Sequence, residues 1–492
     1  MCAWQFGDSF DCYATTADMA NGYWDTLTLA PTLIAGRFAG SQALHLVANF
    51  TLIKSSGVND AVHHVVMAVR QTAALSGTST VGGYLTFYDG TTGQCTICFR
   101  SDGAIILASG ASAAGTLLAT YAGAVTAINT WFAFEFEITI NNTTGRFRVR
   151  KNGNPADDFD SGAVLDTQNS ANAYANKLQV GCGNSIPSIA DIDDLYWRSD
   201  ATSVPWLGDI KCMARAPASD ASVQFSRSAP VYIQPGVGSS TANVTTGTAR
   251  YTPVVAAYTG SVSAVSAMFP SASTCNMKCS IFASSGTAPT TVLGSATVTA
   301  LSAASSGTFT FGTQVPVVKG TQYWVGIESD ATSGQTNATS GTTGLSSTTA
   351  YAAFPVASPA TIAAQAPNLS MTINTNVNAD FVNEPQQDAT TSYVYDSVPG
   401  HADLYGIAAI ASTPLTTYAV TTRAYMIKSD AGTRTAAVQL KSGSSTVASP
   451  TVVLTPSNWQ WAWRHDPLDP ATGAAWTAAA VNVCTIGPTV IA

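Results

Sequence analysis

Short runs of alternating polar and apolar residues, separated by turn dipeptides, are the feature that most restricts the fold of this chain. Tyr84–Tyr88 is followed by Asp89-Gly90, and Trp131–Ile140 leads through a polar turn into a second run that ends at Asn152-Gly153. Asp-Gly and Asn-Gly between such runs are strong hairpin signals. Helical periodicity is nearly absent, and we expect one short helix over 474–482. The pattern therefore predicts an all-β chain of tandem antiparallel β-sandwiches or jelly rolls.

The distribution of charge divides the chain. With 492 residues it is too long for one hydrophobic core, and about three domains are expected. Between Ser228 and Val377 there are only five charged side chains, whereas charges return after Asn378. We therefore predict a lectin-like sandwich over 1–201, a C-terminal β-domain made of 202–228 plus 378–492, and a jelly-roll-like domain inserted at 229–377.

Composition argues against several classes of protein. The net charge is −8, and the 21 basic residues form no basic stripe, so we do not expect nucleic-acid binding. Met1–Tyr13 has neither a basic nor an apolar leader region, and no apolar stretch is long and uninterrupted enough to insert into a membrane. Nine cysteines are too sparse for a disulfide scaffold, and we expect most, including Cys95 and Cys98 of a lone C-x-x-C, to be buried thiols.

Segments from several parts of the chain resemble known proteins. The opening Phe6-Gly7-Asp8-Ser9-Phe10-Asp11, the pair of runs in 131–153 and the segment Asp191–Tyr196 resemble the concanavalin A-like (laminin G-like) sandwiches of bacteriophage tail and virion proteins. The C-terminal segment Asp466–Thr477 resembles a recurrent ending of phage structural proteins. In that pattern a stretch like Leu207–Ile210 continues directly into one like Asn383–Asp388, so the charge-poor region is an insertion. Parts of that region, such as Lys278–Phe311, resemble sugar-binding jelly rolls.

The sequence gives little support for catalysis. Glu135 and Glu137 lie on one face of a predicted strand, at a spacing near that of a glycosidase carboxylate pair. Because Phe132, Phe134 and Phe136 alternate with them and should fill the core, we expect both glutamates to be solvated. His63 and His64 are adjacent, so their rings should face opposite sides of a strand. We find no nucleophile elbow and no phosphate-binding loop. We therefore predict that the chain is not an enzyme and has no catalytic or cofactor-binding residues.

Two further sets of residues could contact a ligand. Asp191, Asp193 and Asp194 are candidates for a Ca2+ site, because lectin-like folds often bind calcium through clustered oxygens. We favour the alternative that these carboxylates keep the end of a strand soluble. The aromatic candidates for stacking on a sugar, or for filling a core or an interface, are Trp459, Trp461, Trp463 and Trp324.

The resemblance implies a non-enzymatic structural protein of the bacteriophage virion. We expect a tail fibre-like or tail accessory adhesin, made in the bacterial cytoplasm, that assembles on the particle as a homotrimer with other virion proteins. Host cell-surface polysaccharide is the implied ligand. A capsid decoration or head-fibre protein is the alternative, and a glycan-degrading tail enzyme is the second alternative.

Overall fold

The protein is almost entirely β-structure, as predicted. A computed structural model describes residues 4–29, 31–72, 80–181, 190–202, 205–227, 231–233, 240–244, 246–256, 258–268, 275–301, 306–331, 334–348, 351–355, 361–367, 369–374, 377–383, 386, 393–410 and 416–492. Within these ranges the helical elements are α1 (Ala478–Val483) and the short 3-10 helices η1 (Thr16–Ala20), η2 (Tyr351–Ala353) and η3 (Asn378–Phe381). No helix in these ranges is long and apolar enough to cross a membrane.

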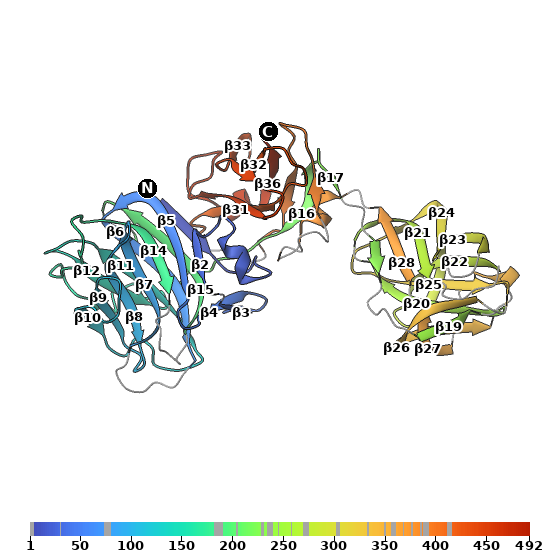
Figure 1. Ribbon diagram of the computed structural model, residues 1–492, viewed down its shortest axis with the longest axis horizontal. Coiled ribbons are helices and arrows are strands. Elements are labelled where there is room, and N and C mark those ends of the chain that lie inside the picture. Colours follow the sequence, from blue (N-terminus) through green and yellow to red (C-terminus); the bar gives the residue numbers. More distant parts are fainter. Residues whose placement is uncertain are drawn as a thin grey trace. The chain divides into compact units, whose positions relative to one another are not determined.

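The chain forms two compact units, each drawn in Figure 1. Unit 1 comprises Met1–Gln224, Asn383–Ala389 and Asp396–Ala492, and unit 2 comprises Phe225–Val382 and Thr390–Tyr395. The chain thus leaves unit 1, forms most of unit 2 and then returns to unit 1. The boundary that we expected inside unit 1, at residue 201, stays a prediction.

The N-terminal part of unit 1 is a sandwich of two antiparallel sheets. In spatial order, sheet A contains β13 (Phe159–Asp160), β12 (Arg146–Lys151), β11 (Trp131–Thr139), β6 (Val62–Gln71), β15 (Ala190–Asp200), β4 (Gln42–His45) and β3 (Thr32–Ala35), and β1 (Trp4–Asp8) pairs with β15. Sheet B contains β10 (Leu117–Tyr121), β9 (Ile105–Ser109), β8 (Thr92–Arg100), β7 (Thr80–Asp89), β14 (Ala175–Gly181), β5 (Thr51–Asp60) and β2 (Thr26–Thr28).

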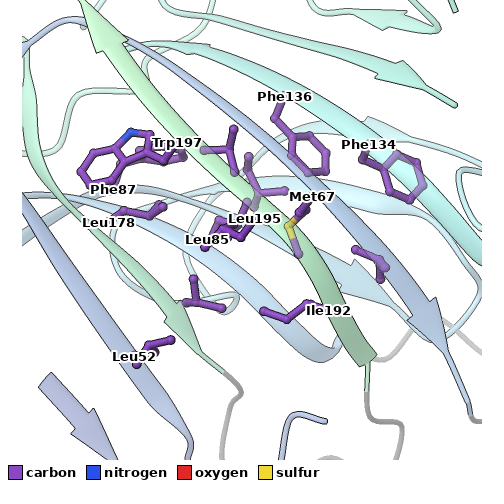
Figure 2. Packing of buried hydrophobic residues seen from close by; sticks show 14 of the residues in the cluster. Leu52, Met67, Leu85, Phe87, Phe134, Phe136, Leu178, Ile192, Leu195 and Trp197 are labelled. Atoms are coloured by element: carbon purple, nitrogen blue, oxygen red, sulfur yellow. The ribbon is translucent and has the colours of Figure 1, made fainter. Parts of the chain in front are cut away.

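The core between these sheets follows from strand alternation. On β11, Phe132, Phe134 and Phe136 are all buried and point into the sandwich, as their spacing predicted. Figure 2 shows Phe134 and Phe136 beside Met67 of β6 and opposite side chains from sheet B. The intervening Glu135 and Glu137 therefore occupy the outer face of sheet A.

The C-terminal part of unit 1 combines a sheet with a two-stranded ribbon. Sheet C contains β16 (Pro217–Ser222), β30 (Leu404–Ile407), β36 (Thr485–Val490), β32 (Arg434–Ser442) and β33 (Ser445–Ala448), and β34 (Val452–Leu454) pairs with β32. The ribbon consists of β31 (Val420–Met426) and β35 (Gln460–Asp466). Helix α1 starts later than the predicted position 474. The N–H of Asp469 donates to the carbonyl of Ala474 at 2.9 Å, so 469–474 closes a turn instead, and Thr477 caps the helix.

Unit 2 consists of two facing sheets and a short β-pair. Sheet D contains β18 (Val231–Ile233), β28 (Leu369–Asn374), β21 (Gly260–Met268) and β24 (Ser306–Val317). Sheet E contains β19 (Ser240–Val244), β26 (Gly334–Thr348), β20 (Thr248–Val255), β25 (Gln322–Ser329), β22 (Cys275–Ser284) and β23 (Pro289–Leu301), and β27 (Thr361–Pro367) pairs with β26. The short pair is β17 (Ser226–Arg227) with β29 (Val394–Tyr395). Buried side chains of both sheets, including Phe309, Met371 and Val325, form the core.

Candidate functional site

One face of the ribbon carries most of the aromatic residues that the sequence singled out. In the register of β31 with β35, Arg423 lies opposite Trp463, and Tyr425 lies opposite Trp461. Directly paired residues share a face of a sheet. The same face therefore presents one guanidinium, one phenol and two indoles. Trp459 precedes β35 and is half-buried.

This face packs against the N-terminal sandwich. Trp461 is buried beside Tyr13, with ring centroids 6.0 Å apart, and its indole N–H donates to the carbonyl of Asp18 at 2.8 Å. The indole N–H of Trp463 donates to the carbonyl of Gly22 at 3.0 Å, and its ring lies 5.3 Å from that of Tyr23. Both indoles therefore satisfy their polar atoms inside unit 1.

Asp8 and Arg423 form the polar centre of this interface. The Asp8 carboxylate is fully buried and accepts hydrogen bonds from the Tyr13 hydroxyl at 2.7 Å and the Trp24 indole at 2.8 Å. Arg423 pairs with it at 3.4 Å and lies 4.1 Å from the ring centroid of Tyr23. Acidic and cationic groups are costly to bury unless they are paired and hydrogen-bonded, and here both conditions hold.

The ribbon face is therefore already occupied. A stacked sugar would have to displace the sandwich from Trp461 and Trp463. Trp461 is buried, whereas Trp463 and Trp459 are both half-buried. Trp459 stacks on Tyr425, with centroids 5.2 Å apart and an interplanar angle of 19°.

Asp191 belongs to a row of paired residues on the outer face of sheet A. His45 lies opposite Asp191, Asp191 opposite Arg70, and Arg70 opposite Trp131. Asp191 is buried and accepts from the Nε of Arg70 at 2.7 Å, while the Arg70 guanidinium lies 4.8 Å from the Trp131 ring centroid. Strand pairing, which is not visible in the sequence, brings these four side chains together.

Asp193 and Asp194 lie at a bulge in β15, where Asp194 has φ of +52°. Both side chains are buried, so our favoured interpretation, carboxylates that solubilise a strand end, is wrong. The physical reason is that β15 lies between β6 and β4, inside sheet A. Asp193 accepts from the N–H of Arg37 at 2.8 Å, and Asp194 accepts from the N–H of Cys212 at 2.7 Å.

Burial dominates the titration of these two carboxyl groups. It raises the pKa of Asp193 to about 6 and that of Asp194 to about 8, and for Asp194 the charge of Asp193 adds to the effect. Arg37 lies 3.6 Å from Asp194 and opposes the shift. Across the described ranges, no three His, Cys, Asp or Glu side chains are arranged to hold a metal ion. The Ca2+ site stays a prediction.

Glu135 and Glu137 are buried, so the expectation that they are solvated is wrong. The linker Trp206–Cys212 covers them: Glu135 accepts from the N–H groups of Leu207 and Gly208, at 2.5 and 2.9 Å. Glu137 pairs with Arg148 at 3.0 Å. Leu207 of the linker lies 72 residues after Glu135 in the sequence, and no local pattern on β11 indicates that the linker returns to cover this strand.

The two adjacent histidines face opposite sides of β6, as predicted. His63 lies in the sandwich core, 5.2 Å from the ring of Phe87, and burial lowers its pKa to about 4. His64 lies on the outer face, 3.2 Å from the Glu135 carboxylate and 4.9 Å from the Trp206 ring. The rings therefore cannot act on one ligand together.

The described cysteines are free thiols. Cys95 is part of the sandwich core, whereas Cys98, three residues further along β8, points to the opposite face. Both are buried, and burial raises the pKa of the Cys98 thiol to about 12. The C-x-x-C pair thus does not converge on one point. Cys2 and Cys182 lie outside the described residues.

Trp324 is buried on the outer face of sheet E in unit 2. Its indole N–H donates to the hydroxyl of Ser284 at 3.1 Å. The neighbouring Tyr323 is part of the core between sheets D and E, so these two aromatic residues face opposite sides, as predicted.

The sequence matches no family model and no curated protein. Among solved structures, it is similar to a carbohydrate-binding module, CBM66, from Bacillus subtilis, with 11% identity over 36% of this chain and 96% of that one and a TM-score of 0.25. A carbohydrate esterase from Shiga toxin-encoding bacteriophage phi24B gives 14% identity over 41% and 99%, with a TM-score of 0.28. The CBM2 module of the evolved Dit of Lactobacillus casei BL23 phage J-1 gives 9% over 41% and 92%, with a TM-score of 0.26.

Replacing Trp461 by alanine should destabilise unit 1 by about 3 kcal/mol, because it removes a buried indole and its hydrogen bond from the interface. The matched control is Trp459→Ala, which removes a half-buried indole and should cost about 1 kcal/mol or less. Denaturant unfolding followed by fluorescence compares the two variants. Equal losses would contradict the assignment of Trp461 to the interface.

The contribution of Asp193 and Asp194 to the stability of unit 1 should decline as pH rises from about 4 to about 8, because the folded state keeps protons on them that the unfolded chain releases near pH 4. The buried His63 and His465, whose pKa values are lowered to about 4, act in the opposite direction below about pH 6.5, so the comparison with a variant isolates the carboxyl groups. Asp194→Asn should flatten the decline. In the control Asp160→Asn, the pKa of the replaced group is about 2 in the folded protein, so the slope over this window should not change. Melting temperatures measured at pH 5, 6, 7 and 8 test this, and an unchanged slope in Asp194→Asn would refute the explanation.

Proposed function

We propose that this chain is a non-enzymatic structural component of a bacteriophage particle, a tail fibre-like or tail accessory adhesin that contacts host surface glycan. The observation that carries the proposal is the insertion of one compact unit within another. The chain passes from unit 1 into unit 2 after Gln224 and returns to unit 1 at Asn383. A folded module inserted at a surface loop can vary without disturbing the unit that carries it.

The internal bonding of unit 1 supports a scaffold role. Its buried carboxylates Asp8, Glu135 and Asp194 each bind groups of the same chain, and two of them hold the linker Trp206–Cys212. An interface this well supplied with hydrogen bonds and aromatic contacts suits a part that stays fixed on a particle. We propose that unit 1 docks to other virion proteins, in a homotrimer.

We assign the binding role to unit 2, because Trp461 and Trp463 of unit 1 pack against the sandwich. Unit 2 places Trp324, Tyr251 and Phe282 together on the outer face of sheet E, where they are buried with Phe354 of the segment 351–355. Aromatic rings are the usual partners for the apolar face of a sugar, with a few polar groups to orient it. A capsid decoration or head-fibre protein with the same units is the alternative location.

The full chain should bind polysaccharide purified from the host strain and release no shorter products. Co-sedimentation measures binding, and size-exclusion chromatography of the recovered glycan tests hydrolysis. The control polysaccharide comes from a strain that the phage does not adsorb to. Hydrolysis would establish the glycan-degrading alternative, and absence of binding would refute the adhesin.

Cryo-electron microscopy of intact particles tests the structural half of the proposal. The adhesin predicts density for unit 1 on the tail or its fibres, repeated around a threefold axis. Density over the capsid would support the decoration protein instead. If the chain is missing from the particle, the proposed virion role is wrong.

A further inference from the structure

The outer face of sheet E contains chemistry that a purely structural surface does not need. Along β25, Tyr323, Val325 and Ile327 point into the core of unit 2, so Trp324, Gly326 and Glu328 point outward. In the paired strands, Lys278 of β22 lies opposite Glu328, and Ser280 lies opposite Gly326. The face thus brings an acid, an amine, a hydroxyl and an indole onto adjacent strands of the sheet in Figure 1.

Two aromatic rings close over Gly326. A Cβ atom at this position would lie 2.9 Å from the ring of Tyr251 and 3.0 Å from that of Phe282. Both rings are fully buried, and their centroids are 5.5 Å apart. Because Gly326 has no side chain, the Tyr251 ring from β20 and the Phe282 ring from β22 can lie against β25, next to Trp324.

Glu328 is the anomalous group on this face. It is fully buried, and within the described part of the chain neither of its carboxylate oxygens makes a well-formed hydrogen bond. Burial raises the pKa of Glu328 to about 7, against the opposing influence of Lys278 and of the Gly247 backbone. A buried carboxylate whose oxygens make no well-formed hydrogen bond costs stability, so its presence calls for an explanation outside the fold.

Lys278, which lies opposite Glu328, bonds to the segment 351–355 and not to the Glu328 carboxylate. The ammonium of Lys278 donates to the carbonyls of Tyr351 and Phe354, at 2.7 and 3.3 Å, and lies 4.5 Å from the Tyr351 ring centroid. Phe354 in turn is buried against Tyr251 and Phe282, at centroid distances of 6.4 and 6.3 Å. The segment 351–355, which we name the strap, thus covers the aromatic face and is held there by one cation.

We propose that the strap is a lid, and that the face beneath it binds one neutral pyranose residue of a glycan. With the strap lifted, the Tyr251 and Phe282 rings over Gly326, two residues along β25 from Glu328, offer an apolar surface to the C–H face of a sugar. Glu328 accepts hydrogen bonds from two of its hydroxyls, and Lys278, released from the strap, donates to a third. Binding would then provide the hydrogen bonds that Glu328 lacks. This inference deepens the proposed function and rests on it.

A neutral sugar suits the face better than a charged one. Glu328 and Lys278 place opposite charges on neighbouring strands, and the exposed Asp330 carboxylate is bonded to Asn276, so the face offers no excess positive charge to an anionic ligand. Two rings over Gly326 with one carboxylate and one ammonium beyond them resemble the general composition of ligand sites, which are mostly apolar with a few polar groups that fix orientation.

Saturation-transfer NMR on the full chain tests the site with four probes, the methyl glycosides of glucose, galactose, mannose and N-acetylglucosamine. At least one should bind, and Glu328→Gln should weaken that binding by about tenfold, the effect of losing a charged hydrogen bond. Asp330→Asn changes an exposed carboxylate two residues further along the chain and should leave binding unchanged. Because Glu328 has no well-formed partner, Glu328→Gln should not lower the melting temperature of unit 2, which separates lost binding from unfolding.

Amide hydrogen exchange tests the lid separately from the sugar site. Lys278→Met removes the hydrogen bonds to Tyr351 and Phe354, so amide hydrogen exchange in the strap should speed up while exchange in β25 does not change. If no glycoside binds, or if Glu328→Gln binds as well as the natural chain, the site is refuted. Should the same full chain still bind host polysaccharide, the proposed function survives without this site, whereas loss of both refutes the proposed function as well.

Discussion

The buried carboxylate of Asp8 connects the two ends of the chain. It accepts hydrogen bonds from the backbone N–H of Phe10 and the side chains of Tyr13 and Trp24, and it pairs with Arg423, which follows it by more than four hundred residues. A carboxylate that accepts this many hydrogen bonds in a dry site holds its donors in one geometry. The opening segment, and the ribbon that packs on it, depend on this one group.

The few charged side chains of the protein largely bond to other groups of the same chain. Glu135 holds Leu207 and Gly208, and Asp194 holds Cys212, so buried carboxylates of the sandwich fasten the linker by its backbone. A chain whose surface consists mostly of short polar side chains can thus still fix the arrangement within unit 1. Unit 1 also contains buried polar atoms without a well-formed hydrogen bond, among them one carboxylate oxygen each of Glu137 and Asp194. Among the described residues, Glu328 of unit 2 is the carboxylate for which this holds for both oxygens.

Local patterns predicted the parts of this structure that depend on local chemistry. The alternation of Phe132, Phe134 and Phe136 correctly identified the buried face of β11, and the adjacency of His63 and His64 correctly separated their rings. Such inferences need only the two-residue period of a strand. They hold whatever the strand pairs with.

The failures have a common physical origin in long-range contacts. The sequence predicted a solvated Glu135 because the linker that covers this residue is distant in sequence. It predicted that Asp193 and Asp194 keep a strand end soluble because the position of β15 inside sheet A is not visible in the sequence. The row from His45 to Trp131, and the pairing of Lys278 with Glu328, depend on strand order in the same way. The sequence contains these residues but does not indicate which of them lie next to one another in the folded protein.

The central claim is that the sandwich and the ribbon form one cooperative unit through Asp8 and Arg423. A double-mutant cycle with Asp8→Asn and Arg423→Met, read from the unfolding free energy of unit 1, tests it most directly. The account predicts a coupling energy of more than about 1 kcal/mol between the two sites. Changes that add to within about 0.5 kcal/mol would contradict it.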